Sequence, residues 1–124
     1  MTPEYDTVAW FQIGSPDPDA AQRFYGELFG WTARHDPTSG ASYRLLTARD
    51  AQAPTGGITA VDDADTAYAT FAVLVRDVAA VCTRATELGG KVLVAPATVP
   101  SGLESAELLD TDGNRFVVFT PPAR

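Results

Sequence analysis

The sequence is poor in the residues that carry most covalent and metal chemistry: its 124 residues include one cysteine and one histidine. A single cysteine, Cys82, excludes an internal disulfide. It lies on the apolar side of an expected helix, where a free thiol behaves as a small hydrophobic group, so we expect a buried structural residue. A nucleophilic cysteine would need an exposed, electropositive setting.

Positive charge is also scarce, with Lys91 the only lysine and a formal net charge of -7. Nucleic acids and anionic membranes select for clustered positive charge, so neither is expected as a partner. No apolar run approaches the roughly 20 residues that span a bilayer. The first residues, MTPEYD, lack the basic and apolar segments of a signal peptide. A cytoplasmic location is therefore expected.

Two stretches sixty positions apart, residues 8–31 and 68–91, share one pattern without a gap. Each reads as a strand, a tight turn and an amphipathic helix. Identical residues that coincide in the repeat include Phe11 with Phe71, Asp17 with Asp77, Ala20 with Ala80, Glu27 with Glu87, Leu28 with Leu88, and Gly30 with Gly90. The chain therefore contains a duplicated unit.

The helix in each copy has its own start and stop signals. Asp17 and Asp77 can cap the first free helical N–H groups, and Gly30 and Gly90 can adopt the left-handed conformation that ends a helix. The expected apolar stripes are Ala20, Ala21, Phe24, Tyr25, Leu28 and Phe29 in the first helix and Val78, Val81, Cys82, Ala85 and Leu88 in the second. We expect both stripes to pack on a sheet.

Three further strands are expected after each helix. They are residues 31–36, 41–48 and 56–61 in the first copy and 91–95, 103–109 and 115–120 in the second. The length fits a single domain, 1–124, made of two βαβββ modules, 5–61 and 66–122. We interpret the acidic residues 62–65 between them as a solvated linker and not as a metal site.

The motif SPDPDAAQRFYGELFGW and the turn DTDGN, within a repeat that covers residues 5–122, resemble the vicinal oxygen chelate superfamily. This superfamily includes glyoxalase I, bleomycin-resistance proteins and extradiol dioxygenases. The resemblance implies an α+β fold in which tandem modules form a curved half-barrel sheet, with the helices on its convex side. It also implies a cup that encloses a ligand and, for modules this short, a homodimer.

Side-chain alternation along the first strand of each module supports a cup independently of that resemblance. Neighbouring side chains on a strand point to opposite faces of the sheet. Phe11, Ile13, Phe71 and Val73 form the uniformly apolar sets that should pack beneath the helices, and Trp10, Gln12, Tyr68 and Thr70 should line the concave face.

The resemblance also implies where a divalent metal ion would bind. One ligand comes from seven residues before the capping aspartate and another from three residues after the asparagine of the DTDGN turn. These positions, with the equivalent position of the first copy, hold Trp10, Gly57, Thr70 and Val117. None has the imidazole, carboxylate or thiolate that divalent metals prefer. We therefore expect no metal site and no cofactor.

Candidate acid–base groups are few. His35 lies off the metal-ligand positions and is expected at the surface or rim. Glu104 and Glu107 lie on one strand with opposite parity, so at most one points into the cup, and Tyr43 is a further candidate. The DTDGN turn starts like a calcium loop, but Arg115 stands where that loop requires glycine, so a structural turn is expected.

The cup that remains is aromatic and carries little charge. The candidate ligand-binding residues are Trp10, Gln12, Tyr43, Leu45, Thr70, Val117 and Phe119. An aromatic ring such as Trp10 can stack on a planar ligand, and Gln12 and Thr70 can fix its orientation by hydrogen bonds. Alternatively, Trp10 and Tyr43 fill the cup themselves or pack in a dimer interface.

The sequence therefore predicts a metal-independent protein that binds a small, partly apolar organic ligand, for example in sequestration or resistance. One alternative is a metal-free isomerase or lyase that uses Glu104, Glu107, Tyr43 or His35. Others are a subunit with a vestigial cup and, less favoured, a metal-dependent glyoxalase or dioxygenase. Fold resemblance alone does not choose between them, because function depends on the site.

Overall fold

The computed structural model describes residues 4–36 and 43–122, and the chain divides into two compact units. The N-terminal unit is Trp10–Ala69, and the C-terminal unit is Met1–Ala9 with Thr70–Arg124. In the part of the chain that the structure describes, no helix is long and apolar enough to cross a membrane.

The described residues of the N-terminal unit form one α-helix, one short 3-10 helix and four strands in the order β2-β3-β4-β1. Its elements are β1 (Thr7–Ser15), which begins in the other unit, α1 (Pro18–Phe29), β2 (Thr32–His35), β3 (Arg44–Thr47), β4 (Gly56–Ala60) and the short 3-10 helix η1 (Ala64–Thr66). β1 runs parallel to β4, and the other pairs are antiparallel. The expected strand at residues 41–48 is shorter in the structure, and positions 41 and 42 lie outside the described residues.

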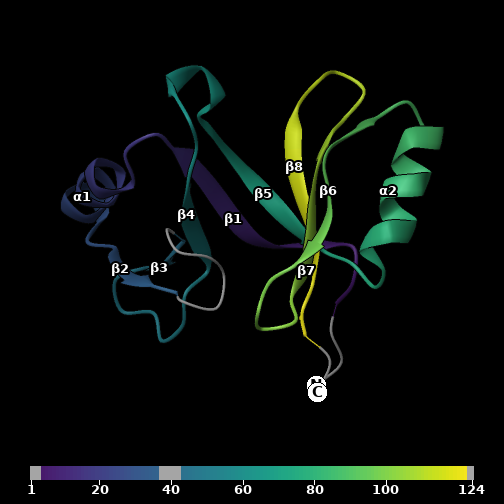
Figure 1. The fold of residues 1–124 in the computed structure, drawn as a ribbon. Helices are drawn as coiled ribbons and strands as arrows, with labels where there is room; N and C mark the ends of the chain where they lie inside the picture. The colour runs from purple at the N-terminus through teal and green to yellow at the C-terminus, as the bar shows by residue number, and fades with distance from the viewer. Residues whose placement is uncertain (1–3, 37–42, 123–124) are drawn as a thin grey trace. The chain divides into compact units, whose positions relative to one another are not determined.

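The C-terminal unit repeats this arrangement with the strand order β5-β8-β7-β6. Its elements are β5 (Tyr68–Leu74), which begins in the other unit, α2 (Val78–Glu87), β6 (Lys91–Thr98), β7 (Glu104–Leu109) and β8 (Arg115–Thr120). β5 runs parallel to β8, and α2 packs against β6, β7 and β8 (Figure 1). The predicted α+β fold with two βαβββ repeats is confirmed, whereas the exact module limits 5–61 and 66–122 stay a prediction.

Both helices begin as the sequence predicts, but only one ends as predicted. The carboxylate of Asp17 accepts a hydrogen bond from the N–H of Ala20 at 3.1 Å, and Asp77 accepts one from Ala80 at 3.0 Å. Gly30 ends α1 with a φ of 76°. The expected stop at Gly90 is wrong, because α2 ends at Glu87 and Gly89 is the residue with a left-handed φ, 100°.

The core of the N-terminal unit lies between its sheet and α1. Ile13, Leu46 and Ile58 are buried there, and Phe11 packs against them, so the predicted helix-facing side of β1 is confirmed. Aromatic rings extend this core: Tyr25 and Trp31 stack with their centroids 5.5 Å apart.

The expectation that the whole apolar stripe of α1 packs on the sheet is wrong. No residue of α1 is fully buried, and Phe24 and Leu28 are 60% and 57% exposed. At 100° per residue, the six expected positions span half the helix circumference, whereas packing on a sheet takes a stripe of roughly 100°. Ala21 and Tyr25 occupy that stripe and contact the core.

The core of the C-terminal unit is more completely buried. It consists of Val75, Val78, Cys82, Ala106, Leu108 and Val118, with Val73 and Phe116 packed against it. The predicted buried thiol is confirmed: Cys82 is 7% exposed. Burial raises the pKa of this thiol, and the nearby carboxylate of Glu104 raises it further.

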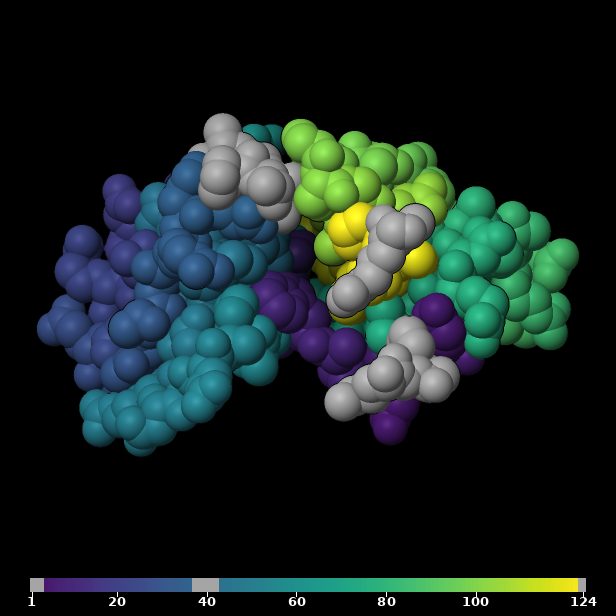
Figure 2. Space-filling view, turned by 90° about the horizontal axis from the view of Figure 1, so that it is seen from below, coloured from purple at the N-terminus to yellow at the C-terminus, as the bar shows by residue number. Residues whose placement is uncertain are grey.

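Strand β6 forms the irregular outer edge of the sheet in the C-terminal unit. It continues through Pro96 to Thr98, beyond the predicted end at residue 95, and its pairing with β7 shifts twice, between Val92 and Val94 and between Val94 and Ala97. All eight residues of the strand are exposed. In Figure 2 the lime-green residues near position 100 lie beside the yellow C-terminal residues of the same unit.

Candidate functional site

Four side chains in the N-terminal unit are hydrogen-bonded in series. The indole N–H of Trp10 donates to the hydroxyl oxygen of Tyr43 at 2.9 Å, and the Tyr43 hydroxyl donates to Oε1 of Gln12 at 3.3 Å. The Nε2 amide group of Gln12 donates to the hydroxyl oxygen of Tyr68 at 2.7 Å. We call these four residues the Trp10–Tyr68 network.

The strand register explains why these side chains meet. Trp10 and Gln12 alternate with Phe11 and Ile13 on β1, so they point away from α1. Gln12 pairs with Gly57 on β4, and Gly57 pairs with Leu45 on β3. Paired residues project from the same face of a sheet, so Leu45 lies on the same face as Gln12, and Tyr43, two residues before Leu45, reaches across β4 toward β1.

Glycines on β1 and β4 make room for the tyrosine rings of the network. A side chain at position 57 would overlap the ring and hydroxyl of Tyr43, and one at position 14 would overlap the ring of Tyr68. A glycine inside a strand is often the mark of such a close approach. In the sequence, the two glycines at the start of β4 indicate a close approach of this kind, but they do not indicate which ring packs against them.

Burial keeps the Tyr43 hydroxyl protonated. Desolvation raises the pKa of this phenol from 10.0 to about 12; the hydrogen bond from Trp10 lowers it, and the charges of Tyr68 and Asp36 raise it. Tyr43 is therefore a neutral hydrogen-bonding group near neutral pH. It can donate or accept a hydrogen bond, but it holds no negative charge with which to act as a base.

The remaining predicted ligand-binding residues, Thr70, Val117 and Phe119, belong to the C-terminal unit. The Thr70 hydroxyl donates to the backbone carbonyl oxygen of Arg115 at 2.5 Å. Val117 pairs with Ala72 and is 5% exposed, and Phe119 is half-buried. These three residues share the face opposite α2, but the hydroxyl of Thr70 is already engaged.

The two candidate carboxylates lie on opposite faces of β7, as their parity predicts. Glu104 lies on the same side as the buried Ala106, and its charge acts on Cys82. Glu107 lies on the other face, where its carboxylate is 3.4 Å from the guanidinium of Arg115. Glu107 is thus the carboxylate on the face opposite α2, and it is held in an ion pair.

His35 and the DTDGN turn are not part of the Trp10–Tyr68 network. His35 ends β2 and is exposed, as expected. In the DTDGN turn, the carboxylate of Asp110 accepts hydrogen bonds from the backbone N–H groups of Asn114 and Asp112 at 2.9 and 2.8 Å, which lower the pKa of Asp110. These bonds close a structural turn, as the sequence predicts.

The residues at the four metal-ligand positions do not fit a divalent cation. Trp10 presents an N–H donor, and the space beside Gly57 is filled by Tyr43. Thr70 is bonded to a backbone carbonyl, and Val117 is buried and apolar. Among the described residues, no three histidine, cysteine, aspartate or glutamate side chains gather as a metal site would require.

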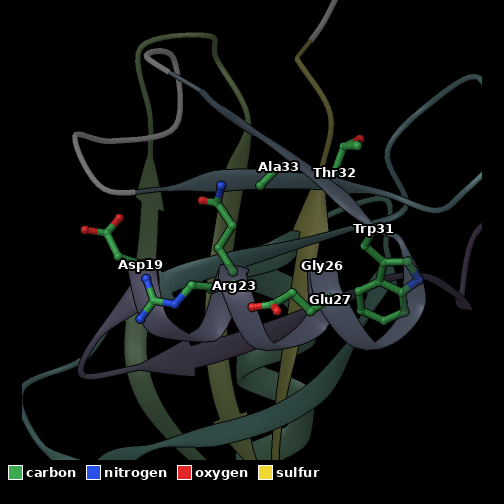
Figure 3. A pocket seen from close by; sticks show the side chains of 8 residues that line it. Asp19, Arg23, Gly26, Glu27, Trp31, Thr32 and Ala33 are labelled. Carbon is green, nitrogen blue, oxygen red and sulfur yellow. The ribbon is translucent and has the colours of Figure 1, made fainter.

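A separate polar groove lies between α1 and β2. Figure 3 shows Asp19, Arg23 and Glu27 projecting from α1 on the side of the helix that faces β2. The groove is lined by Asp19, Gln22, Arg23, Gly26, Glu27, Trp31, Thr32 and Ala33. Arg44 forms an ion pair with one of the lining residues, with its guanidinium 2.7 Å from the carboxylate of Asp19. None of the predicted ligand-binding residues lines this groove, and nothing in the sequence pattern pointed to it.

Comparison with known proteins places the fold. The family model named Glyoxalase/Bleomycin resistance protein/Dioxygenase superfamily matches residues 7–118. Proteins of Mycobacterium bovis and Mycobacterium tuberculosis, both named "Putative glyoxylase CFP32", are 31% identical over 132 aligned positions, which cover 95% of this chain and 45% of theirs. The chain thus spans about half the length of these relatives.

Solved structures resemble the fold at lower sequence identity. Methylmalonyl-CoA epimerase of Mycobacterium tuberculosis has a TM-score of 0.63 at 16% identity, over 99% of this chain and 94% of that one. The Streptomyces coelicolor epimerase with 2-nitronate-propionyl-CoA has a TM-score of 0.65 at 18% identity, over 97% of both chains. A Mn(II)-bound glyoxalase of Novosphingobium aromaticivorans has a TM-score of 0.64 at 20% identity, over 97% of this chain and 41% of that one.

Proposed function

Because the chain belongs to the Glyoxalase/Bleomycin resistance protein/Dioxygenase superfamily, we propose that it is a metal-independent member that binds a small, partly apolar organic molecule. The ligand contacts Trp10, Gln12, Tyr43 and Leu45 on the face of the N-terminal unit opposite α1. The biological role that suits such a site is sequestration of the ligand, as in resistance.

The Trp10–Tyr68 network is the observation that supports this proposal most directly. It holds an indole ring, two phenol rings and an amide in fixed positions through three hydrogen bonds. All four side chains are only half-buried, so they remain accessible from solvent. Aromatic surface with a few fixed polar groups is the usual composition of a small-molecule site.

Metal independence follows from the chemistry of the side chains at the four ligand positions. The test is elemental analysis of the dialysed protein, followed by titration with zinc, nickel, manganese and iron. We expect less than stoichiometric metal after dialysis and no change in tryptophan fluorescence during titration. A stoichiometric ion that survives dialysis would contradict the proposal.

Ligand binding can be tested by a thermal-shift screen of aromatic natural products and small oxoacids. A ligand at 100 times its Kd stabilises the native state by about 2.7 kcal/mol. Trp10→Ala should abolish the shift caused by any hit. Phe71→Ala is the matched control, because Phe71 is an exposed aromatic residue of β5 outside the proposed site, and it should leave the shift unchanged. A hit that is equally sensitive to both substitutions would argue for a different site.

The alternative of a metal-free isomerase or lyase has less support. Tyr43 stays protonated because burial raises its pKa to about 12, and Glu107 is paired with Arg115. Glu104 lies toward α2, and His35 is exposed at the end of β2. Turnover that Glu107→Gln abolishes, with binding retained, would favour the enzyme over the binding protein.

We further propose that the chain forms a homodimer, as the family resemblance of its short modules implies. Exposed apolar side chains on α1, Phe24, Leu28 and Phe29, offer a surface that such a contact could cover. Sedimentation at micromolar concentration tests this: a monomeric mass would contradict it. The cytoplasmic location and the absence of nucleic-acid partners remain predictions from composition.

A further inference from the structure

We infer that the ligand of the Trp10–Tyr68 network is uncharged and carries a hydrogen-bond acceptor next to a donor, as an amide does. This inference rests on the proposed binding function and specifies the class of ligand. It follows from the hydrogen-bonding positions that the network leaves open and from the charges that surround it.

The open positions are found by counting donors and acceptors. The Gln12 amide has two N–H donors and an acceptor oxygen, and the network uses one N–H, toward Tyr68, and one lone pair, toward Tyr43. The Tyr43 oxygen accepts one hydrogen bond, from Trp10, and can accept another. Among the described residues, one N–H donor of Gln12 and one acceptor lone pair of Tyr43 are therefore left unused by the network.

A ligand amide matches this pair of groups. Its carbonyl oxygen can accept from the second N–H of Gln12 while its own N–H donates to Tyr43. The Tyr43–Gln12 bond, at 3.3 Å, is longer than usual for a hydroxyl donor, so it is the weakest of the three bonds and lets the Tyr43 hydroxyl adjust to a ligand bound beside it. A flat apolar group on the ligand could then lie against the indole of Trp10.

Charge around the network disfavours an anion. The carboxyl group of Asp36 acts on the Tyr43 hydroxyl, and its negative charge disfavours a further negative charge beside that hydroxyl. The described ion pairs of the N-terminal unit place Arg44 on Asp19, on the α1 side of the sheet and away from the network. Arg34 shares the face of the network, because it pairs with Leu45, but it lies on β2, three strands away from Gln12 on β1. A carboxylate at Gln12 would therefore lose its hydration without gaining an adjacent cationic partner, which is costly in a half-buried site.

A cation is also a poor match. Gln12 directs an N–H donor at the ligand, and an ammonium group has no lone pair with which to accept it. Asp36 already has an interaction partner of its own. An uncharged ligand avoids both costs and uses both open positions.

Tyr68 acts in this site as a positioning residue. It accepts the hydrogen bond from Nε2 of Gln12 and thereby fixes which edge of the amide faces Tyr43. Gly14 allows this, because any larger residue there would overlap the Tyr68 ring. Loss of the Tyr68 hydroxyl should therefore reduce discrimination between ligands more than it reduces overall affinity.

The experiment compares three ligands that share one ring system: 2-naphthamide, 2-naphthoate and 2-naphthylmethylamine. Binding is followed in the intact chain by the NMR resonance of the Trp10 indole N–H, and the Trp31 indole, which packs in the core under α1, is an internal control. We expect the amide to shift the Trp10 resonance, to leave the Trp31 resonance unchanged, and to bind at least about tenfold more tightly than either charged analogue.

Two substitutions in the network and one control substitution on α1 test whether the network causes the preference for the amide. Gln12→Glu removes both N–H donors and adds a negative charge, and it should weaken amide binding at least about tenfold. Gln22→Glu makes the same chemical change on α1 and should have no effect. Tyr68→Phe should keep the Trp10 shift but lower the ratio of amide to carboxylate affinity, which a purely structural role would leave unchanged.

Each result decides something. Equal or tighter binding of the carboxylate or the amine at Trp10 overturns the inference but leaves the proposed binding function standing. Failure of all three ligands to shift the Trp10 resonance at millimolar concentration also overturns the inference, and the proposed function is then judged separately by the wider thermal-shift screen. If Gln12→Glu fails to fold, the inference is tested by the ratio of amide to carboxylate affinity in Tyr68→Phe: an unchanged ratio contradicts it.

Discussion

The two repeats of this chain share one topology but use their side chains differently. In the C-terminal unit, α2 buries Val78 and Cys82, and the polar groups opposite the helix are engaged with one another, Thr70 with the backbone of Arg115 and Glu107 with its guanidinium. In the N-terminal unit, α1 buries no residue completely. The face opposite α1 carries the Trp10–Tyr68 network, which still has open hydrogen-bonding positions.

Under the proposed function, this difference corresponds to a division of roles between the two repeats. Buried apolar surface stabilises a fold roughly in proportion to its area, so the C-terminal unit supplies more of the packing energy. Half-buried polar aromatic groups stabilise less, but they are the groups that recognise ligands. A repeated fold can thus keep one copy for stability and one for binding.

The largest effect should come from truncating the better-packed core. Leu108 is fully buried, so Leu108→Ala should lower the free energy of unfolding by about 2–5 kcal/mol, through lost burial and the cavity left behind. Leu28→Ala on α1 removes a side chain that is 57% exposed and should change the free energy of unfolding of the monomer by less than about 0.5 kcal/mol, when measured at a protein concentration too low for a dimer to form. Urea denaturation measures both. Equal losses of unfolding free energy in the two variants would contradict the proposal that the C-terminal unit is the better packed of the two.

The next effect should come from the network. Tyr43→Phe removes two hydrogen bonds, the one accepted from the indole N–H of Trp10 and the one donated to Gln12; at about 0.5–1.5 kcal/mol each, their loss should cost about 1–3 kcal/mol. The same substitution should shift the Trp10 indole resonance. Thr70→Val, which removes a hydroxyl in the other unit, is the control: it should lower stability without moving that resonance. A Trp10 resonance unchanged by Tyr43→Phe would show that the network does not exist in solution.

Removing the capping aspartate of either helix should lower the free energy of unfolding by a smaller amount, which should be the same in the two repeats. Asp17→Ala and Asp77→Ala each remove a carboxylate that accepts one backbone N–H, at 3.1 and 3.0 Å. Each should cost about 1 kcal/mol of unfolding free energy. Circular dichroism during denaturation measures this. A cost at one cap more than twice that at the other would mean that the asymmetry extends to the helix starts.

The smallest expected effect is the pH dependence of stability that comes from the Tyr43 phenol, which can be detected only at alkaline pH. Its pKa in the folded state, about 12, lies above its ordinary value of 10.0, so folding favours the protonated form. That stabilisation is fully present below pH 10 and is lost as the pH rises to about 12. Stability of the wild-type chain should therefore fall more steeply over this range than that of Tyr43→Phe. If the stability of the two proteins falls equally with pH, the Tyr43 hydroxyl is not buried as the structure shows.

The sequence predicted most of the fold because its signals are local. A capping aspartate, a helical stripe and strand alternation fix elements and faces without knowledge of their neighbours. Thus Asp17 and Asp77 cap as predicted, and Phe11 and Ile13 face α1. The exposure of Phe24 could not be predicted, because it depends on how much of α1 the sheet covers.

The candidate site was predicted only in part for the same reason. Alternation put Trp10 and Gln12 on one face, but the bond from Trp10 to Tyr43 depends on strand register and on the missing side chain at Gly57. The opposite parity of Glu104 and Glu107 was readable from the sequence. Which of them faces α2 was not, because that is decided by the pairing of β7 with β8.

The irregular strand β6 has a consequence for self-association. An edge strand offers its unpaired backbone groups as a template on which another extended chain can grow. Here two register shifts interrupt the spacing of those groups, and Pro96 has no N–H to donate. The exposed Val92, Leu93 and Val94 therefore lie on an edge that cannot seed a continuous ladder, and straightening that edge would turn it into a starting point for fibres.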